Sequence, residues 1–317
     1  MQFDFLMLGP SGVGKTSVLA TMNNELARIS DPSSFDLRPT GATSNRLRKA
    51  FVELRGIKKL HAHVPIPATL EHTEGPVEHS FEVLFGDRKE LDLVFWDTRG
   101  ATMFDVGELG NELKTTLSGS CVIFNVLDAA VLMEGDACLS EEYNGHQRIR
   151  ELLLDLNGDS DRLVVFVLTK CERWLRAPES LNETNVAKLI ERFEQLHKPV
   201  LNLIQKRENM AGVVIPVQTL GCVEFSRTQR NQKTNQQEFI FVRTPDADFA
   251  PRDVDQPLRY ALAFALFKNH VGRGWWDWIF DWLLGRDAQF IDSLRSFAKK
   301  RRKYKRYGNK SLFKVDL

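Results

Sequence analysis

The sequence has few of the features that would place a protein in a membrane or outside the cell. It contains no run of about 18 apolar residues, so we expect no transmembrane helix. Its apolar N-terminal run follows no basic segment and leads straight into a glycine-rich loop, so we expect a first strand and not a signal peptide. These absences predict a cytoplasmic protein.

Cysteine is also scarce. The 317-residue chain has four cysteines, which lie far apart at Cys121, Cys138, Cys171 and Cys222. No two of them have the spacing of a metal-ligand pair, and a chain of this size does not need a disulfide framework. We expect reduced thiols.

Neither positive nor negative charge predominates over the whole chain, but the charged residues are unevenly distributed. There are 43 Lys and Arg against 42 Asp and Glu, and the 43% hydrophobic and 27% charged content is that of an ordinary globular protein. The segment Lys299–Lys310 holds eight basic residues and no acid, so the rest has a net charge of −7. The sequence therefore predicts a mildly acidic body and a strongly basic C-terminal segment.

The most informative stretch lies near the N-terminus and fits Gly-x-x-x-x-Gly-Lys-Thr. An apolar run, residues 3–8, precedes it and a helical pattern follows it, so backbone N–H groups and a helix N-terminus can converge on one anion. Lys15 is expected to reach the β- and γ-phosphates, and the Thr16 hydroxyl to hold Mg²⁺. The expected phosphate-binding residues are Gly9, Pro10, Ser11, Gly12, Val13, Gly14, Lys15, Thr16 and Ser17.

A second motif follows a predicted β-hairpin made of residues 79–85 and 91–96. The second run ends in Asp97-Thr98-Arg99-Gly100. A carboxylate at the end of a buried strand can hold a Mg²⁺-bound water, and the Gly100 N–H can bind a γ-phosphate and release it after hydrolysis. This pattern predicts a nucleotide switch.

Two later motifs can contact a base. Residues 163–168 read as a strand that ends in Thr169-Lys170-Cys171-Glu172, and the strand 213–218 leads into Thr219-Leu220-Gly221. A carboxylate at Glu172 can accept hydrogen bonds from guanine N1–H and its exocyclic amine, a donor pattern that adenine lacks, while the Lys170 stem covers the base. Glu172 is one methylene longer than the usual aspartate.

The remaining segments are predicted from periodicity and polarity. Residues 43–60 have helical spacing with one basic face, which we interpret as a solvated face or a binding patch. Residues 227–237 are polar and predict a loop, residues 237–242 a short strand, and residues 258–270 an apolar helix.

The C-terminal segment combines aromatic and basic residues. Residues 275–284 carry four of the six tryptophans, and Phe290, Ile291, Leu294 and Phe297 form a second amphipathic stretch ahead of the basic run. This pattern is consistent with packing on the body, with docking to a protein, or with contact at an anionic membrane surface. No base-reading motif favours a specific nucleic acid.

These motifs, in this order, resemble those of P-loop GTPases of the translation-factor-like (TRAFAC, Ras-like) class over residues 1–270. The last two are also similar to bacterial double-GTPase-like domains. The resemblance implies a P-loop NTPase α/β fold, with a six-stranded, mostly parallel sheet and helices on both faces. It divides the chain into a GTPase domain, 1–270, and a Trp-rich and basic extension, 271–317. It implies GTP/GDP and Mg²⁺ as ligands, and protein effectors as partners, with peripheral contact at the inner membrane surface as a further option.

The chain departs from that pattern at two points. Ala101 follows Gly100 where many Ras-like proteins carry a water-orienting glutamine, so hydrolysis should be slow or depend on a partner. The switch threonine that completes the Mg²⁺ shell is best placed at Thr73, with Thr40 and Thr43 as alternatives. The expected catalytic residues are Lys15, Thr16, Gly100 and Thr73, and the expected metal ligands are Thr16, Asp97 and Thr73.

Three functions fit these motifs. The first is a guanine-nucleotide switch that hydrolyses GTP slowly. The second is an ATP-using P-loop enzyme in which residues 169–172 are incidental. The third is a module that binds nucleotide without turnover.

Overall fold

The computed structural model describes most of the chain. The described residues are 2–29, 35–62, 65–66, 77–97, 108–156, 160–176, 179–232, 237–267 and 288–313. Thr73, Gly100 and the Trp-rich residues 275–284 lie outside them.

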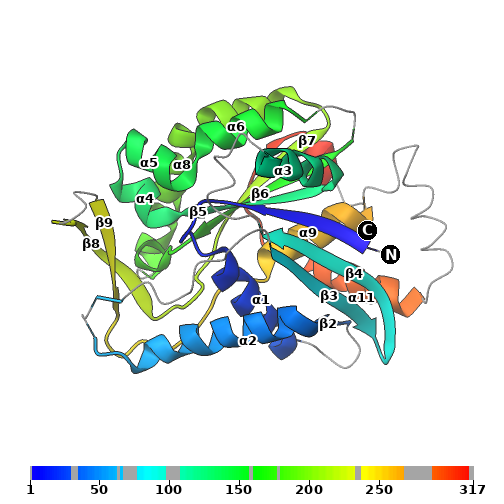
Figure 1. Cartoon of the computed structure of the whole chain (residues 1–317), viewed down its shortest axis with the longest axis horizontal. Coiled ribbons are helices and arrows are strands. Elements are labelled where there is room, and N and C mark those ends of the chain that lie inside the picture. The colour runs from blue at the N-terminus through cyan, green and yellow to red at the C-terminus, as the bar shows by residue number, and fades with distance from the viewer. Residues whose placement is uncertain are drawn as a thin grey trace.

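An eight-stranded sheet runs through the middle of the molecule in the order β10-β7-β6-β5-β1-β4-β3-β2 (Figure 1). The strands are β1 (Gln2–Leu8), β2 (Asp36–Pro39), β3 (Val77–Phe85), β4 (Arg88–Asp97), β5 (Val122–Asp128), β6 (Arg162–Thr169), β7 (Met210–Pro216) and β10 (Lys305–Gly308). The five central strands, from β7 to β4, are parallel, whereas β3, β2 and β10 join antiparallel. The expected α/β class with a mostly parallel sheet is confirmed, with eight strands where six were expected and with β2 and β10 at the edges.

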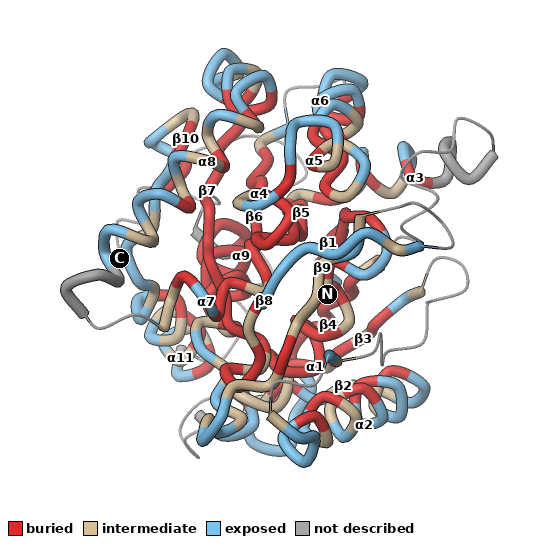
Figure 2. Tube along the Cα trace, turned by 90° about the vertical axis from the view of Figure 1, so that its left-hand side faces the viewer, coloured by how far each residue is buried: buried red, intermediate tan, exposed pale blue. Residues whose placement is uncertain are grey.

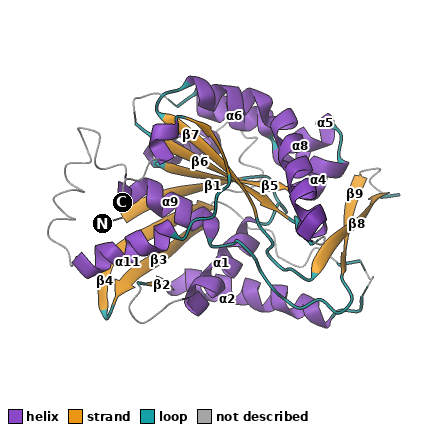
Figure 3. Ribbon diagram, turned by 180° about the vertical axis from the view of Figure 1, so that it is seen from behind, coloured by secondary structure: helices purple, strands orange, loops and turns teal. Residues whose placement is uncertain are grey.

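Helices cover both faces of this sheet (Figure 3). One face carries α1 (Lys15–Ile29), α2 (Gly41–Gly56), α9 (Gln256–Phe267) and α11 (Ala288–Lys299), and the other carries α3 (Glu108–Gly119), α4 (Ala129–Glu134), α6 (His146–Leu154) and α8 (Glu179–Lys206). The short elements are α5 (Ala137–Asn144), α7 (Glu172–Leu175), η1 (Ile57–Lys59) and η4 (Lys310–Phe313). Strand β5 shows why both faces need cover, because Phe124 packs on one side and Ile123 on the other, so the centre of the sheet is buried throughout (Figure 2).

Three arginines satisfy the carbonyl groups left over at helix C-termini on one face of the sheet. Arg162 donates to carbonyls at the end of α3, at distances of 2.7–3.0 Å. Arg192 does the same for the end of α4, and Arg207 for the end of α6. The last carbonyls of a helix have no partner within the helix, and a guanidinium with five N–H groups can bind several of them at once.

A hairpin outside the main sheet corrects one expectation. Residues 227–237 were expected to form a loop, but β8 (Val223–Arg230) pairs antiparallel with β9 (Gln237–Arg243), so residues 227–230 belong to a strand. Their side chains are exposed and polar, so no apolar alternation reveals them in the sequence. On the edge of β9 that faces away from β8, the Ile66 N–H donates to the Phe241 carbonyl at 2.9 Å.

The described part of the C-terminal segment is built into the same core as the sheet. Helix α11 packs on α9, with Phe290 and Leu294 fully buried. The basic run continues into β10, which pairs with β7, and Arg302 and Lys305 make ion pairs with Asp253 and Glu194. The division of the chain at residue 270 stays a prediction. Within the described residues, no helix has both the length and the apolar character needed to cross a bilayer.

His197 of α8 is a titratable group buried in the core. Its ring stacks on Phe193 with 4.7 Å between ring centroids, and neither ring nitrogen makes a hydrogen bond of normal geometry with a described residue. Burial, with the neighbouring His146, lowers the pKa of His197 to about 3. The folded protein therefore keeps this ring neutral where the unfolded chain would protonate it.

We expect this histidine to make the folded state less stable in acid. Between pH 6.5 and about 3 the unfolded chain binds a proton at His197 that the folded chain does not, so the free energy of unfolding falls as the pH falls, by about 1.4 kcal/mol per pH unit from this group. When urea unfolding is measured between pH 4.5 and 7.5, the free energy of unfolding of His197→Leu should depend less steeply on pH than that of the wild type. The exposed His61 serves as the control, because His61→Gln should leave the slope unchanged. An unchanged slope in His197→Leu would contradict this assignment.

Candidate functional site

The expected strand–loop–helix arrangement is present at the N-terminus. Residues 9–14 connect β1 to α1, and the Val18 N–H donates to the Gly14 carbonyl at 2.9 Å in the first turn of the helix. Gly9, Gly12 and Gly14 have φ values of +148°, +79° and +100°. A side chain at Gly9 would place its Cβ 2.6 Å from the Val126 carbonyl oxygen, so the loop needs glycine there to pass close to β5.

Lys15 folds back over the loop that precedes it. Its ammonium donates to the carbonyls of Gly9 at 2.7 Å and Pro10 at 3.2 Å, and it lies 3.7 Å from an Asp97 carboxylate oxygen. Only 8% of the residue is exposed. Burial lowers the pKa of this ammonium, and Asp97 opposes that effect. The loop thus holds a buried positive charge beside its backbone N–H groups.

Asp97 ends β4 directly beside this lysine. The residue is 1% exposed, and neither carboxylate oxygen has a hydrogen bond of normal geometry among the described residues. Burial raises the pKa of Asp97 to about 6, against the opposing effects of Lys15 and Thr16. The buried ring of His79 on β3 lies 4.0 Å from the same carboxylate, and burial lowers its pKa to about 4, so His79 is neutral at pH 7 and does not compensate the charge.

This donor set fits a hard divalent cation held together with phosphate. A buried carboxylate without a hydrogen-bond partner gains from a cation, and the Thr16 hydroxyl next to it supplies a second oxygen. Mg²⁺ in nucleotide sites is bound by one or two protein oxygens plus substrate phosphates and water, and not by a complete protein cage. Among the described residues, no group of three or more His, Cys, Asp or Glu could hold a metal.

Thr169 joins the end of β6 to the predicted phosphate loop. Its hydroxyl lies 2.6 Å from the Val13 carbonyl oxygen and 3.0 Å from that of Leu127. Its side chain also faces Gly14, where a Cβ would lie 3.7 Å away. The end of β6 and the phosphate loop are therefore in direct contact, as the two motifs require.

Lys170 is held at its charged end by two neighbours. Its ammonium forms an ion pair with the Asp128 carboxylate at the end of β5 and lies 5.0 Å from the centre of the Phe241 ring on β9. Asp128 is itself fixed, because it caps α4 by accepting from the Ala130 and Val131 N–H groups.

Glu172, the expected base-binding carboxylate, is buried. It is 3% exposed, and its Oε1 accepts from the N–H groups of Leu220 at 3.2 Å and Gly221 at 3.4 Å. Burial raises the pKa of this carboxyl. The structure thus brings the expected residues 172 and 219–221 together, but one oxygen of Glu172 is already engaged by the loop.

The switch residues are placed only in part. Thr73 and Gly100 lie outside the described residues. Of the alternatives, the Thr40 hydroxyl donates to the Ser80 carbonyl at 3.2 Å, and the Thr43 hydroxyl accepts from the Ser80 N–H at 3.0 Å. Both of these threonines tie α2 to β3.

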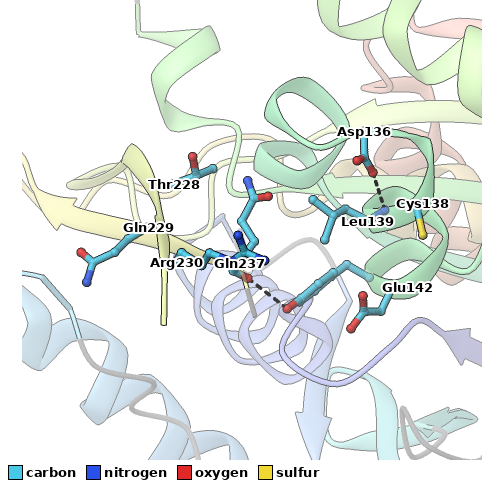
Figure 4. Close-up of a pocket in the computed structure, with 9 residues that line it drawn as sticks. Asp136, Cys138, Leu139, Glu142, Thr228, Gln229, Arg230 and Gln237 are labelled. Carbon is cyan, nitrogen blue, oxygen red and sulfur yellow. Dashed lines mark hydrogen bonds between the residues drawn. The ribbon is translucent and has the colours of Figure 1, made fainter. Parts of the chain in front are cut away.

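A separate cavity of about 570 Å³ opens between α5 and the β8–β9 hairpin (Figure 4). Its lining is polar and includes Asp136, Glu142 and Arg230. None of the predicted site residues lines it. Tyr143, also in the lining, donates to the Gln237 carbonyl at 3.3 Å across the cavity and so joins its two walls.

The structure adds three residues that sequence reasoning missed. Asp128 had a signal, because it follows a buried strand directly, as Asp97 does. His79 lay in a predicted hairpin strand, but only the pairing of β3 with β4 brings it to Asp97. Phe241 had no local signal, because it reaches Lys170 through the fold of a distant hairpin.

No protein-family model matches this sequence, and a search of curated proteins finds no match. Among solved structures, the chain is similar to the Arl6 BBS3 small GTPase from Trypanosoma brucei with bound nucleotide analogue GppNp, at 13% identity and a TM-score of 0.34, with 69% of this chain and 88% of that chain covered. It is also similar to the LeoA bacterial dynamin GTPase from ETEC, at 15% identity and a TM-score of 0.37, with 68% of this chain and 30% of that chain covered.

Proposed function

We propose that this chain is a guanine-nucleotide switch that hydrolyses GTP to GDP slowly and in a Mg²⁺-dependent way. The observation that carries the proposal is the Asp97 carboxylate, which is buried beside Lys15 and Thr16 and lacks a normal hydrogen bond among the described residues. The Lys15 ammonium at 3.7 Å does not offset the cost of burying this carboxylate, because the pKa of Asp97 stays raised, so a second cation would stabilise it. A magnesium–nucleotide complex brings that cation, together with the anion for which the loop is shaped.

The phosphates would be held by the backbone N–H groups of residues 9–17 and by Lys15. The ammonium of Lys15 now donates to two neutral carbonyls. A phosphate oxygen in their place carries a negative charge, so the ammonium would gain a Coulomb attraction that a neutral carbonyl does not offer. Lys15 would therefore contribute strongly to the free energy with which the phosphates bind.

Thr16 and Asp97 would hold Mg²⁺, with Thr73 as the proposed switch ligand. When bound, Mg²⁺ neutralises charge on the β- and γ-phosphates. Gly100 would sense the γ-phosphate through its N–H. Ala101 cannot orient water, so the proposal includes slow intrinsic turnover and activation by a protein partner.

Thr169, Lys170 and Glu172, with the Thr219–Gly221 loop, would form the base pocket. Glu172 Oε1 accepts from Leu220 and Gly221, and the same carboxylate would also accept from the donors of guanine. The C-terminal segment is proposed to contact an effector, with a cytoplasmic location and peripheral contact at the inner membrane surface as further proposals.

Competition between nucleotides tests the base assignment. We expect GTP to displace a fluorescent GTP analogue at concentrations at least about 30-fold lower than ATP, because leaving a buried carboxylate unpaired against adenine costs on the order of 2–5 kcal/mol. Glu172→Gln should narrow this ratio to about 10-fold or less. Glu194→Gln, on the surface of α8, is the matched control and should keep the wild-type ratio. Equal displacement by GTP and ATP in the wild type would remove the guanine assignment.

The alternative is an ATP-using P-loop NTPase, and the engaged oxygen of Glu172 is the observation that favours it. A nucleotide-binding module without turnover is the other alternative, supported by Ala101. The rate of phosphate release from bound GTP distinguishes a module without turnover from the slow GTPase switch, because the module releases phosphate only at the background rate.

A further inference from the structure

We propose that Phe241 is a positioning residue that holds Lys170 in place over the base of the bound nucleotide. The inference rests on the proposed function and adds to the base pocket a residue from the β8–β9 hairpin. The Lys170 ammonium lies 5.0 Å from the centre of the Phe241 ring, within the distance at which the face of an aromatic ring attracts a cation.

Lys170 reaches this position from an unusual backbone conformation. Its φ is +57°, which residues with a side chain seldom adopt. The ammonium is then held at its far end by the Asp128 carboxylate and by the Phe241 ring. Because the Lys170 stem is fixed at both ends before a base binds, its side chain loses little rotamer entropy when the base packs against it.

The ring of Phe241 is itself fixed by its backbone. Phe241 pairs with Phe225 across the hairpin, and on the other edge of β9 its carbonyl accepts from the Ile66 N–H at 2.9 Å. The ring also meets the buried Phe225 ring edge-to-face, with 6.0 Å between centroids. The position of the aromatic face is therefore set by pairing on both edges of the strand.

Neighbouring residues of α5 hold both supports of Lys170. The Tyr143 hydroxyl donates to the Gln237 carbonyl at 3.3 Å, and its ring packs on Phe239, which fixes the hairpin. Asn144 accepts from the Asp128 N–H at 2.8 Å, which fixes the end of β5. Helix α5 therefore holds both the β8–β9 hairpin and the end of β5. These contacts fix the two groups that hold the Lys170 ammonium in place.

The test compares a ligand that has a base with one that has none. Nucleotide-free wild-type protein and its variants are titrated by calorimetry with GDP and with inorganic tripolyphosphate, both with Mg²⁺. Phe241→Leu should weaken GDP binding by about 5- to 20-fold, because leucine fills space but has no ring face to attract the cation. Tripolyphosphate binding should stay within about twofold of the wild type, and Phe241→Tyr should restore GDP binding. Phe51→Leu on α2, whose ring packs edge-to-face on Phe249, makes the same substitution away from Lys170 and should leave both affinities unchanged.

A double-substitution cycle separates positioning from a loss of structure. If Phe241 acts through Lys170, then Phe241→Leu has no further effect on GDP affinity in a Lys170→Met background. Equal weakening of GDP and tripolyphosphate, or an undiminished effect in that background, would overturn the proposal. A wild-type protein that binds tripolyphosphate but not GDP would overturn the proposed function, and this inference with it. A wild type that binds GDP, combined with a silent Phe241→Leu, would overturn this inference alone.

Discussion

Replacing Lys15 with alanine is expected to weaken GTP binding by at least about 100-fold. This ammonium is buried against the Gly9 and Pro10 carbonyls, and burial lowers its pKa, so it gains strongly from an anion in the loop. Removing one partner of a buried charged pair costs on the order of 3 kcal/mol, which corresponds to about 100-fold in affinity. Isothermal titration calorimetry of nucleotide-free protein with GTP and Mg²⁺ measures the change.

Two further variants show whether the loss comes from the charge. Lys15→Met keeps most of the apolar volume and should lose about as much affinity as the alanine variant. Lys114→Ala removes an exposed lysine of α3 that pairs with Asp155, and it should bind GTP like the wild type. A Lys15→Ala protein within threefold of wild-type affinity would show that the nucleotide site lies elsewhere.

Asp97→Asn is expected to raise the free energy of unfolding and to reduce the effect of Mg²⁺ on GTP binding. Burial raises the pKa of Asp97 from an ordinary 3.8 to about 6, so above pH 6 the folded protein carries a charge that the site disfavours. That difference corresponds to roughly 3 kcal/mol, so the neutral variant should raise the free energy of unfolding of the nucleotide-free protein by about 2–3 kcal/mol at pH 7.5. Urea unfolding of the variant and the wild type in EDTA measures this difference in the free energy of unfolding.

The same variant should lose most of the effect of Mg²⁺ on GTP binding. In the wild type, removing Mg²⁺ with EDTA should weaken GTP binding by at least about tenfold, whereas Asp97→Asn should bind with nearly the same affinity with and without the metal. Asp92→Asn, which alters a surface carboxylate of the same strand paired with Lys89, is the control for both measurements. An Asp97→Asn protein that is less stable and keeps the full Mg²⁺ effect would refute this role.

The phosphate loop could be predicted from the sequence because its geometry is local. A buried strand, three glycines with positive φ and a helix N-terminus are contiguous, so the conformation that binds an anion follows from neighbouring residues. Asp97 and Thr169 were predictable for the same reason, since each follows the end of a buried strand, and parallel strands end at the same edge of a sheet.

The supports of Lys170 could not be predicted in this way. Asp128 and Phe241 come from different strands, and only tertiary packing places both of them at one ammonium. The enclosure of Glu172 is likewise a long-range result, because the loop that engages its Oε1 lies 48 positions further along the chain. Pattern reasoning identified the base-side segments but not the contacts that shape them.

The sequence by itself determined the alternation of buried strands with helices, the phosphate loop and the position of the basic segment. The tertiary structure decided that the basic segment continues into β10 on the edge of the main sheet, and that a polar stretch becomes β8. The physical reason is that side chains on edge strands face water and carry little apolar pattern. Whether such a segment becomes a strand is therefore decided by the backbone hydrogen bonds that a neighbouring strand offers.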